Sequence, residues 1–272
     1  MEKYSVLMSL YKKENPAFFR AALDSMINQT AKPDEIVLVE DGPLTDELYE
    51  VVNEYSDCLR IVKNDYNLGL GLALNVGLQA CTNELVARMD TDDIAVIDRC
   101  EKQVDFLNSN LDVAIVGGQI EEFIDDPHNI IGIRNVPETD KELKMYMKKR
   151  CPFNHMTVMF RKTAVIKSGN YQKWFWNEDY YLWIRMALNN FKFSNLPETL
   201  VFVRTGNDLY QRRGGKAYFK SELDIQKLML SRGMISFTRF AVNTIERYIL
   251  QVLMPNKIRG FVFRTLARKK PE

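Results

Sequence analysis

Short apolar runs alternate with amphipathic segments through residues 1–118 of this 272-residue chain. The apolar runs have the length of strands, and the segments between them repeat apolar residues at helical spacing. This alternation predicts a doubly wound, mostly parallel α/β sheet, because two parallel strands need a crossover connection between them. Strands are expected at 5–10, 35–39, 59–63, 84–89 and 113–117, and helices at 16–28, 46–55, 71–80 and 98–108.

The pattern changes after residue 118, where polar turns and longer helices follow. Residues 120–136 have the pattern of irregular or antiparallel β structure, so a smaller antiparallel region is expected beside the parallel sheet. The expected division of the chain is 1–118, 119–215 and 216–272, with the last part helical. Further strands are expected at 154–161 and 199–204, and further helices at 140–150, 178–190, 216–232 and 235–253.

The overall composition excludes several kinds of protein. A net charge of +1 gives no reason to expect nucleic acid as a partner. The cysteines are widely spaced and form no C-x-x-C pair, which argues against a zinc site and favours a reducing compartment. The chain shows no signal peptide and no apolar run of membrane-spanning length, so a cytoplasmic protein is expected.

The C-terminal end is strongly basic, in contrast to the rest of the chain. From residue 255 to 272 there are six Lys or Arg and one acid, Glu272, and apolar residues recur from residue 245 onward. A basic amphipathic helix is typical of proteins that lie on an anionic membrane surface. The alternative is a helix packed on the rest of the protein with its cationic side outward. We expect peripheral membrane association.

Acidic side chains follow two of the predicted strands. Asp90, Asp92 and Asp93 come after the strand at 84–89, and Glu40 and Asp41 after the strand at 35–39. Open α/β sheets bind ligands at the carboxyl edge of their strands, and two nearby carboxylates can share a hard divalent cation with substrate phosphates. The sequence therefore predicts a metal-assisted enzyme acting on a diphosphate-activated substrate. The alternative for each cluster is a solvated turn.

Glycines recur in the segment 67–77, Asn-Leu-Gly-Leu-Gly-Leu-Ala-Leu-Asn-Val-Gly. The segment lacks the lysine of a P-loop, and Leu74 stands where the dinucleotide fingerprint requires glycine. We therefore expect these glycines to allow a tight loop and close helix packing, with direct phosphate binding as the less favoured alternative.

Several motifs together resemble glycosyltransferase family 2. The matching segments are Ser5–Tyr11, Val39-Glu-Asp-Gly42, Asn67-x-Gly69 with Ala73-x-Asn75-x-Gly77, Met89-Asp-Thr-Asp-Asp93, Asn154–Lys162 and Glu178–Arg185. They occur in the family's order and spacing and cover about residues 3–205. The resemblance implies a GT-A fold and a nucleotide-diphosphate-sugar donor.

The resemblance assigns roles in donor binding position by position. It implies nucleotide-sugar contacts for Ser9, Tyr11, Glu40, Asp41, Asn67, Asp90 and Thr91. Glu40 stands where the family usually has an Asp that reads the base N–H. Asp92 is expected to bind Mn²⁺ or Mg²⁺, and Asp93 either assists or is structural. The metal would neutralise charge that develops on the leaving diphosphate.

On the acceptor side, Asp179 is the expected general base, which takes a proton from the attacking hydroxyl. Glu178 is the alternative base, and a plain helix N-terminus is the alternative to both, because acids are favoured there. Expected contacts to acceptor or phosphate are His155, Trp183, Arg185, Arg212 and Arg213. The alternatives are a structural, hydrogen-bonded role for His155, a core position for Trp183 and a solvated surface for the basic segment with Arg212 and Arg213.

The resemblance thus implies an inverting, metal-dependent transferase that moves a hexose from a UDP-sugar, with glucose, galactose and their N-acetylated forms all open. It implies an undecaprenyl-diphosphate-linked saccharide as acceptor, in O-antigen, capsule or exopolysaccharide synthesis at the cytoplasmic face of the bacterial inner membrane. Residues 1–118 would bind the donor, 119–215 the acceptor, and 216–272 the membrane. The rival functions are a nucleotidyltransferase acting on a sugar phosphate and a non-catalytic sugar-nucleotide-binding module.

Overall fold

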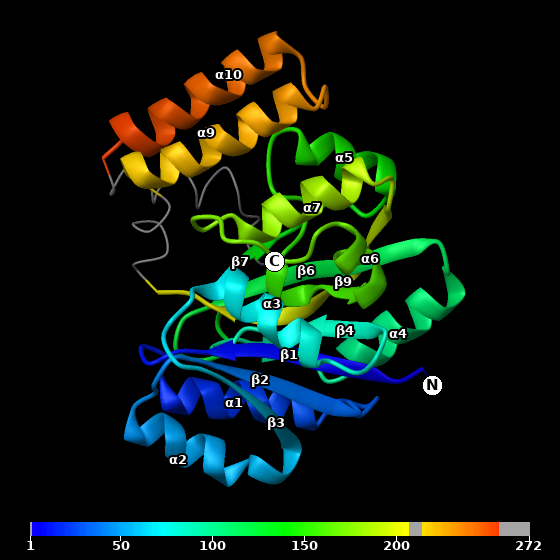
Figure 1. Cartoon of the computed structure of the whole chain (residues 1–272), viewed down its shortest axis with the longest axis vertical. Helices are drawn as coiled ribbons and strands as arrows, with labels where there is room; N and C mark the ends of the chain where they lie inside the picture. The colour runs from blue at the N-terminus through cyan, green and yellow to red at the C-terminus, as the bar shows by residue number, and fades with distance from the viewer. Residues whose placement is uncertain (1, 207–213, 256–272) are drawn as a thin grey trace.

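The computed structural model describes residues 2–206 and 214–255, in which a central sheet is covered by helices on both faces (Figure 1). The strands of this described part form one sheet in the order β3-β2-β1-β4-β8-β6-β9-β5, and β7 pairs with β6. The mixed α/β architecture with a mostly parallel sheet confirms the expected fold class.

The first half of the chain forms the parallel part of the sheet, with strand order β3-β2-β1-β4. A strand order that reverses beside β1 places the carboxyl ends of β1, β2 and β4 next to a crevice where α/β sheets bind ligands. The elements are β1 (Tyr4–Leu10), α1 (Pro16–Ile27), β2 (Glu35–Asp41), α2 (Asp46–Glu54), β3 (Leu59–Asn64), α3 (Leu70–Ala80), β4 (Leu85–Arg88) and α4 (Arg99–Ser109).

The second half adds the antiparallel region and more helices. Strand β8 inserts antiparallel between β4 and β6, and β9 runs parallel to β6. The elements are β5 (Ile94–Ala95), β6 (Val113–Phe123), β7 (Ile130–Arg134), α5 (Asp140–Met147), β8 (Met159–Arg161), α6 (Lys162–Lys167), α7 (Glu178–Leu188), β9 (Lys192–Arg204), α9 (Lys216–Ser231) and α10 (Phe237–Tyr248). Short helical turns lie at η1 (Ser56–Cys58), η2 (His155–Thr157) and η3 (Ile249–Leu253).

The structure differs from the sequence-based expectation at several places in this half, and strand β6 continues to Phe123, past its expected end at residue 117. The strand expected at 154–161 begins as the turn η2, because Thr157 Oγ1 donates to the carbonyl of Asn154 at 2.8 Å and closes the chain on itself. Strand β9 begins well before the expected residue 199, and its polar first half is held by pairing with β6. The short β5 and α6 were not expected, since neither is long enough to show a hydrophobic period.

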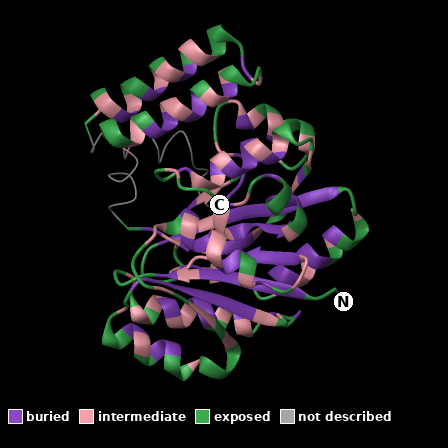
Figure 2. Ribbon diagram, viewed as in Figure 1, coloured by how far each residue is buried: buried purple, intermediate pink, exposed green. Residues whose placement is uncertain are grey.

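Two hydrophobic cores lie on opposite faces of the sheet, whose central strands β1, β2, β4 and β6 are buried almost throughout (Figure 2). Helices α1, α2 and α4 cover one face, and α3, α5, α6 and α7 cover the other. The pair α9 and α10 packs at one end of the molecule, beyond α5 and α7 (Figure 1). Within the described residues, none of the helices combines the length and hydropathy that crossing a bilayer requires.

Local signals in the sequence set where the helices begin. The side chain of Asn15 accepts hydrogen bonds from two backbone N–H groups of α1, and Pro16 occupies its first turn. Thr139 and Glu142 form a reciprocal capping box at α5. These caps satisfy backbone donors that the helix itself leaves unpaired.

Helix α3 lies very close to the sheet because it carries Gly77. A Cβ built on Gly77 would come within 2.5 Å of both Leu7 Cδ1 and Val39 Cγ2, side chains of β1 and β2. The absent side chain therefore lets α3 approach the strands whose ends carry the acidic residues. This agrees with the packing role expected for the glycines of segment 67–77.

Gly77→Val is expected to destabilise the fold by about 1–3 kcal/mol, because the added branches overpack a core that has no space for them. Denaturant unfolding followed by circular dichroism measures the change. Gln79→Val, on the solvent-exposed side of the same helix, is the matched control for helix propensity. Equal stability of the two variants would contradict the close packing of α3 on β1 and β2.

Candidate active site

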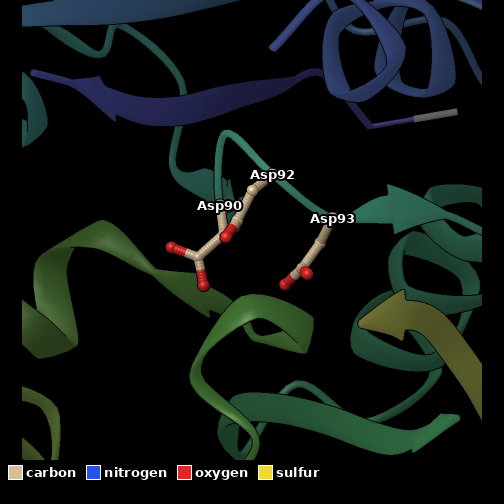
Figure 3. Close-up of side chains that lie close together, drawn as sticks. All are labelled: Asp90, Asp92 and Asp93. Atoms are coloured by element: carbon tan, nitrogen blue, oxygen red, sulfur yellow. The ribbon is translucent and has the colours of Figure 1, made fainter. Parts of the chain in front are cut away.

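Three carboxylates gather where β4 ends. Each of Asp90, Asp92 and Asp93 offers a carboxylate oxygen, and the three oxygens lie within 4.8 Å of one another. Figure 3 shows the three side chains projecting from the loop between β4 and β5. The sequence predicted this juxtaposition, because all three residues directly follow a buried strand.

The charge balance of the cluster fits a divalent cation. Burial, and then the neighbouring Asp92 and Asp90 charges, raise the pKa of Asp93 well above its ordinary value. The backbone N–H of Arg204 donates to Asp93 Oδ1 at 2.9 Å, whereas the buried Oδ2 accepts no hydrogen bond within the described residues. Hard cations such as Mg²⁺ and Mn²⁺ take carboxylate oxygens, and a bound cation would offset the mutual repulsion of these three groups.

Arg88 is a buried cation beneath the cluster that the sequence analysis did not single out. Its side chain is 2% exposed and forms an ion pair with Asp90. Burial raises the pKa of Asp93, Glu178 and Asp179, and the positive charge of Arg88 opposes this rise at all three, so one guanidinium acts on two acidic groups. Arg88 directly follows the apolar run Leu-Val-Ala of a buried strand. This position could have indicated a buried arginine, and a buried charge is normally paired.

Arg204, at the end of the strand expected at 199–204, is a second cation at this site. Its Nε donates to the carbonyl of Asp92 at 3.3 Å, and its guanidinium stacks 3.8 Å from the centre of the Phe18 ring. It therefore fixes the backbone of the acidic loop from β9. More than a hundred residues separate the partners in sequence, so no local spacing reveals the contact.

Glu178 and Asp179 form the second acidic group, at the first turn of α7. Burial, and then the charge of Asp179, raise the pKa of Glu178 to about 7. Burial also raises the pKa of Asp179, whose Oδ2 accepts a hydrogen bond from the Cys151 thiol at 3.4 Å. A carboxyl with a pKa near neutrality is suited to exchange a proton with substrate.

The glycine segment and this acidic pair pack together. A Cβ on Gly71, at the start of α3, would lie 2.7 Å from the carbonyl oxygen of Gln172 and 3.0 Å from Glu178 Cβ. The absence of a side chain there lets α3 and α7 meet at their N-terminal ends. Asp90 adds to the repulsion that raises the pKa of Glu178, so the two acidic groups lie within electrostatic reach of each other.

Glu178→Gln is expected to stabilise the protein in EDTA at neutral pH by about 1–3 kcal/mol. The raised pKa means that ionising Glu178 costs the folded state, while the unfolded chain ionises it near its ordinary pKa. The gain should be absent below about pH 4, grow as pH rises and level off above about pH 7. Urea unfolding across this range measures it, and a gain that does not change with pH would contradict the raised pKa.

The second acidic strand end organises a loop. Asp41 accepts hydrogen bonds from the backbone N–H groups of Leu68 at 2.8 Å and Gly69 at 3.0 Å, and Asn67 Nδ2 donates to the Asp41 carbonyl at 3.2 Å. Asp41 and Asn67 therefore shape the loop that leads into α3. Any donor contact by these residues stays a prediction.

Glu40 has a carboxylate oxygen that is available to accept a hydrogen bond. Its carboxylate is almost fully buried, Oε2 lies 3.3 Å from Lys63 Nζ, and Oε1 has no hydrogen-bond partner in the described part of the chain. Ser9 and Tyr11 lie at the carboxyl end of the neighbouring β1, and Thr91 is buried within the acidic loop. Their expected nucleotide contacts stay predictions.

Three expected acceptor contacts are instead built into the protein. Trp183 has no exposed surface and packs edge-on against Phe153. Arg185 donates to the carbonyls of Ser168 and Asn170 at 2.6 and 2.7 Å, so its guanidinium holds a turn. His155 Nε2 lies 3.0 Å from the Tyr171 hydroxyl, and burial lowers the pKa of its ring, which keeps the imidazole neutral.

These three positions give structural reasons for residues that sequence reasoning assigned to the acceptor, and we do not carry the acceptor roles of Trp183 and Arg185 forward. Arg212 and Arg213, the other expected contacts, lie outside the described residues. The basic tail at 257–270, the basis of the expected membrane-binding helix, also lies outside them.

Solved glycosyltransferases share this fold. The mannosyltransferase PcManGT from Pyrobaculum calidifontis, solved with GDP-Man and Mn²⁺, matches with a TM-score of 0.65 and 16% identity, over 94% of this chain and 71% of that chain. S. aureus TarS 1-349, solved with UDP-GlcNAc, matches with a TM-score of 0.64 and 18% identity, over 91% of this chain and 72% of that chain. The mixed α/β architecture of this chain is therefore the GT-A fold.

The sequence comparisons specify the family. The family model described as Glycosyl transferase family 2 matches residues 5–175, and the chain belongs to this family. An uncharacterized glycosyltransferase of Haemophilus influenzae is 44% identical over 98% of this chain and 100% of its own length. The Erwinia amylovora amylovoran biosynthesis glycosyltransferase AmsE is 40% identical over 96% and 97%. The Escherichia coli UDP-Gal:alpha-D-GlcNAc-diphosphoundecaprenol beta-1,3-galactosyltransferase is 37% identical over 98% and 97%. The resemblance drawn from the motifs is confirmed, and the protein is a glycosyltransferase.

Proposed function

We propose that this protein is an inverting, metal-dependent hexosyltransferase. It moves a hexose from a UDP-sugar to a lipid-diphosphate-linked saccharide in the synthesis of a bacterial surface polysaccharide. One observation carries the proposal: the three carboxylates at the end of β4 lie within 4.8 Å of one another, and the Glu178–Asp179 pair of α7 lies within electrostatic reach of them. One group suits a donor diphosphate with its cation, and the other suits an acceptor hydroxyl.

Asp92 is the principal metal ligand in this proposal, with Asp90 and Asp93 beside it. The bound cation, Mn²⁺ or Mg²⁺, would supply positive charge to the leaving nucleoside diphosphate. Arg88 holds the Asp90 carboxylate in place from below, and Arg204 holds the backbone of the loop. Glu40 presents one unpaired carboxylate oxygen toward the nucleoside side, where it would accept the base N–H.

Asp179 is the proposed general base. It takes the proton of the acceptor hydroxyl while that oxygen attacks the anomeric carbon from the side opposite the diphosphate, which inverts the configuration. The Cys151 thiol donates to its carboxylate and orients it. No second acid is needed, because the diphosphate leaves as a stable anion.

The relatives support the donor and acceptor classes. The Escherichia coli relative is named for a UDP-Gal donor and a GlcNAc-diphosphoundecaprenol acceptor, and the Erwinia amylovora relative for amylovoran biosynthesis. We extend to this chain a UDP-hexose donor, glucose or galactose or an N-acetylated form, and an undecaprenyl-diphosphate-linked acceptor. An enzyme that uses a UDP-sugar donor and a lipid-linked acceptor acts at the cytoplasmic face of the inner membrane in this proposal.

Release of UDP from a panel of donors tests the proposal. UDP-Gal, UDP-Glc, UDP-GlcNAc and UDP-GalNAc are each incubated with a GlcNAc-diphosphate-lipid acceptor, in Mn²⁺ and in EDTA. We expect one donor to release UDP with acceptor and metal present, and little release in EDTA. Release of pyrophosphate from UTP and a sugar phosphate would instead show a nucleotidyltransferase. Donor binding without turnover on any acceptor would show a binding module.

A further inference from the structure

Helix α10 and the turn η3 are amphipathic in the inverted sense: polar residues face the protein and apolar residues face outward. Asn243, Arg247 and Gln251, spaced four apart, are buried. The exposed side carries six large apolar or aromatic residues, Phe237, Val242, Ile245, Tyr248, Ile249 and Leu253. Phe237 is 72% exposed, Ile245 60% and Leu253 61%, which is unusual for one face of a single helix.

The polar face is fixed in place by specific partners. Arg247 Nε donates to Glu222 Oε2 of α9 at 2.5 Å, and its Nη2 donates to the carbonyl of Lys149 at 2.5 Å. Asn243 Nδ2 donates to Gln226 Oε1 at 2.8 Å and to the carbonyl of Lys148 at 2.8 Å. Rolling the helix to bury its apolar side would leave this ion pair and these amides without partners, which is costly. The polar contacts of Asn243 and Arg247 therefore keep the apolar face of α10 directed outward.

We propose that this outward face, defined by the six residues above, lies on the surface of a phospholipid bilayer with anionic headgroups. The proposal rests on the proposed function, in which the acceptor is a membrane lipid. A helix with one broad apolar face lies in the interface plane, with that face among the acyl chains. Glu246 is the single acid between residues 237 and 253, and its Oε2 lies 3.2 Å from Lys149 Nζ, so its negative charge is offset by an ion pair.

The chain that follows this face favours lipid over a protein partner. Residues 256–272 contain six Lys or Arg and one acid in the sequence. Positive residues next to an apolar face add attraction to anionic headgroups. The apolar face ends at Leu253, so these residues begin within a few positions of it.

Contacts connect the proposed membrane face to the catalytic pair. Figure 1 shows α10 as the outermost helix, with α9 between it and the rest of the protein. Helix α9 in turn holds the loop before Glu178, because Asn177 Nδ2 donates to Ser221 Oγ at 3.0 Å and Trp174 Nε1 to the Ser221 carbonyl at 3.4 Å. A membrane-bound α10 thereby sets the position of the general base relative to the lipid surface.

Vesicle flotation of the full chain tests this proposal. The triple variant Phe237→Ser, Ile245→Ser, Ile249→Ser removes apolar surface from the outward face. The matched control, Leu111→Ser, Met145→Ser, Ile166→Ser, changes exposed apolar residues elsewhere. With vesicles of phosphatidylglycerol and phosphatidylethanolamine, we expect the face variant to bind about tenfold more weakly or worse, and the control to bind like wild type. Transfer to a short-chain, water-soluble acceptor should stay unchanged in both, while transfer to acceptor embedded in vesicles falls in the face variant only.

Three outcomes would overturn the inference. The face variant could bind vesicles as wild type does, or binding could depend only on the basic residues 257–270. Alternatively, light scattering could show a wild-type dimer that the face variant converts to a monomer, so that a second copy covers the face. If the wild-type protein transferred no hexose to the soluble acceptor, that result would contradict the proposed function, whatever the vesicles show.

Discussion

Asp92→Ala is expected to lower kcat/KM for transfer by about a thousandfold, with Mn²⁺ affinity reduced in parallel. The substitution removes one oxygen ligand from a cluster whose three carboxylates lie within 4.8 Å. Loss of charge stabilisation at the leaving diphosphate amounts to several kcal/mol, and each 1.36 kcal/mol is about tenfold in rate.

Electron paramagnetic resonance of Mn²⁺ measures metal binding separately from turnover. Asp105→Ala, an exposed acid on α4, is the matched control and should bind Mn²⁺ and transfer hexose as wild type does. Unchanged Mn²⁺ binding together with unchanged transfer in the Asp92 variant would remove the cluster from the mechanism. Unchanged binding with lost transfer would move the metal role to Asp90 and Asp93.

Asp179→Asn is expected to lower kcat by about 10²–10⁴-fold, the range that a positioned general base contributes. The amide oxygen can still accept the hydrogen bond from Cys151, so the fold around α7 should be kept. The KM for the UDP-sugar should change little, because in the proposed mechanism the other acidic group binds the donor.

Single-turnover kinetics separates this chemical step from product release. Mn²⁺ binding, which we propose for the Asp cluster, should be unaffected by Asp179→Asn. Glu178→Gln serves as the comparison, since it changes the neighbouring carboxyl and should cost less. If Glu178→Gln abolished transfer and Asp179→Asn did not, the two residues would exchange roles.

Much of the sheet and its acidic edge could be predicted from the sequence, because the signals are local. An apolar strand followed by an acid predicts a carboxylate at the carboxyl edge, and this rule placed Glu40 and Asp90 correctly in the fold. The glycines of α3 were also understood correctly as packing positions, as Gly71 and Gly77 show.

The parts that could not be predicted depend on contacts between distant segments. Arg204 meets the acidic loop from β9, and Cys151 meets Asp179 from a loop far from it in sequence. For Trp183 the sequence is compatible with both a sugar contact and a core residue, and α7 turns this residue into the core. Its neighbours in sequence do not show which side of the helix is buried.

Helix α10 shows a different limit of sequence reasoning. Its periodicity correctly predicts a helix with a broad apolar face, and such a face normally packs inward. The direction was decided by Arg247 and Asn243, whose partners on α9 and after α5 are found only in the folded structure.

The configuration of the new glycosidic bond tests the proposed function most directly. The product of wild-type protein, the active UDP-hexose, Mn²⁺ and a GlcNAc-diphosphate-lipid acceptor is analysed by the one-bond C–H coupling of its anomeric carbon. We predict a β-linked hexose made from the α-linked donor, with no product in EDTA. An α-linked product, or equal product in EDTA, would contradict inverting, metal-dependent transfer at this site.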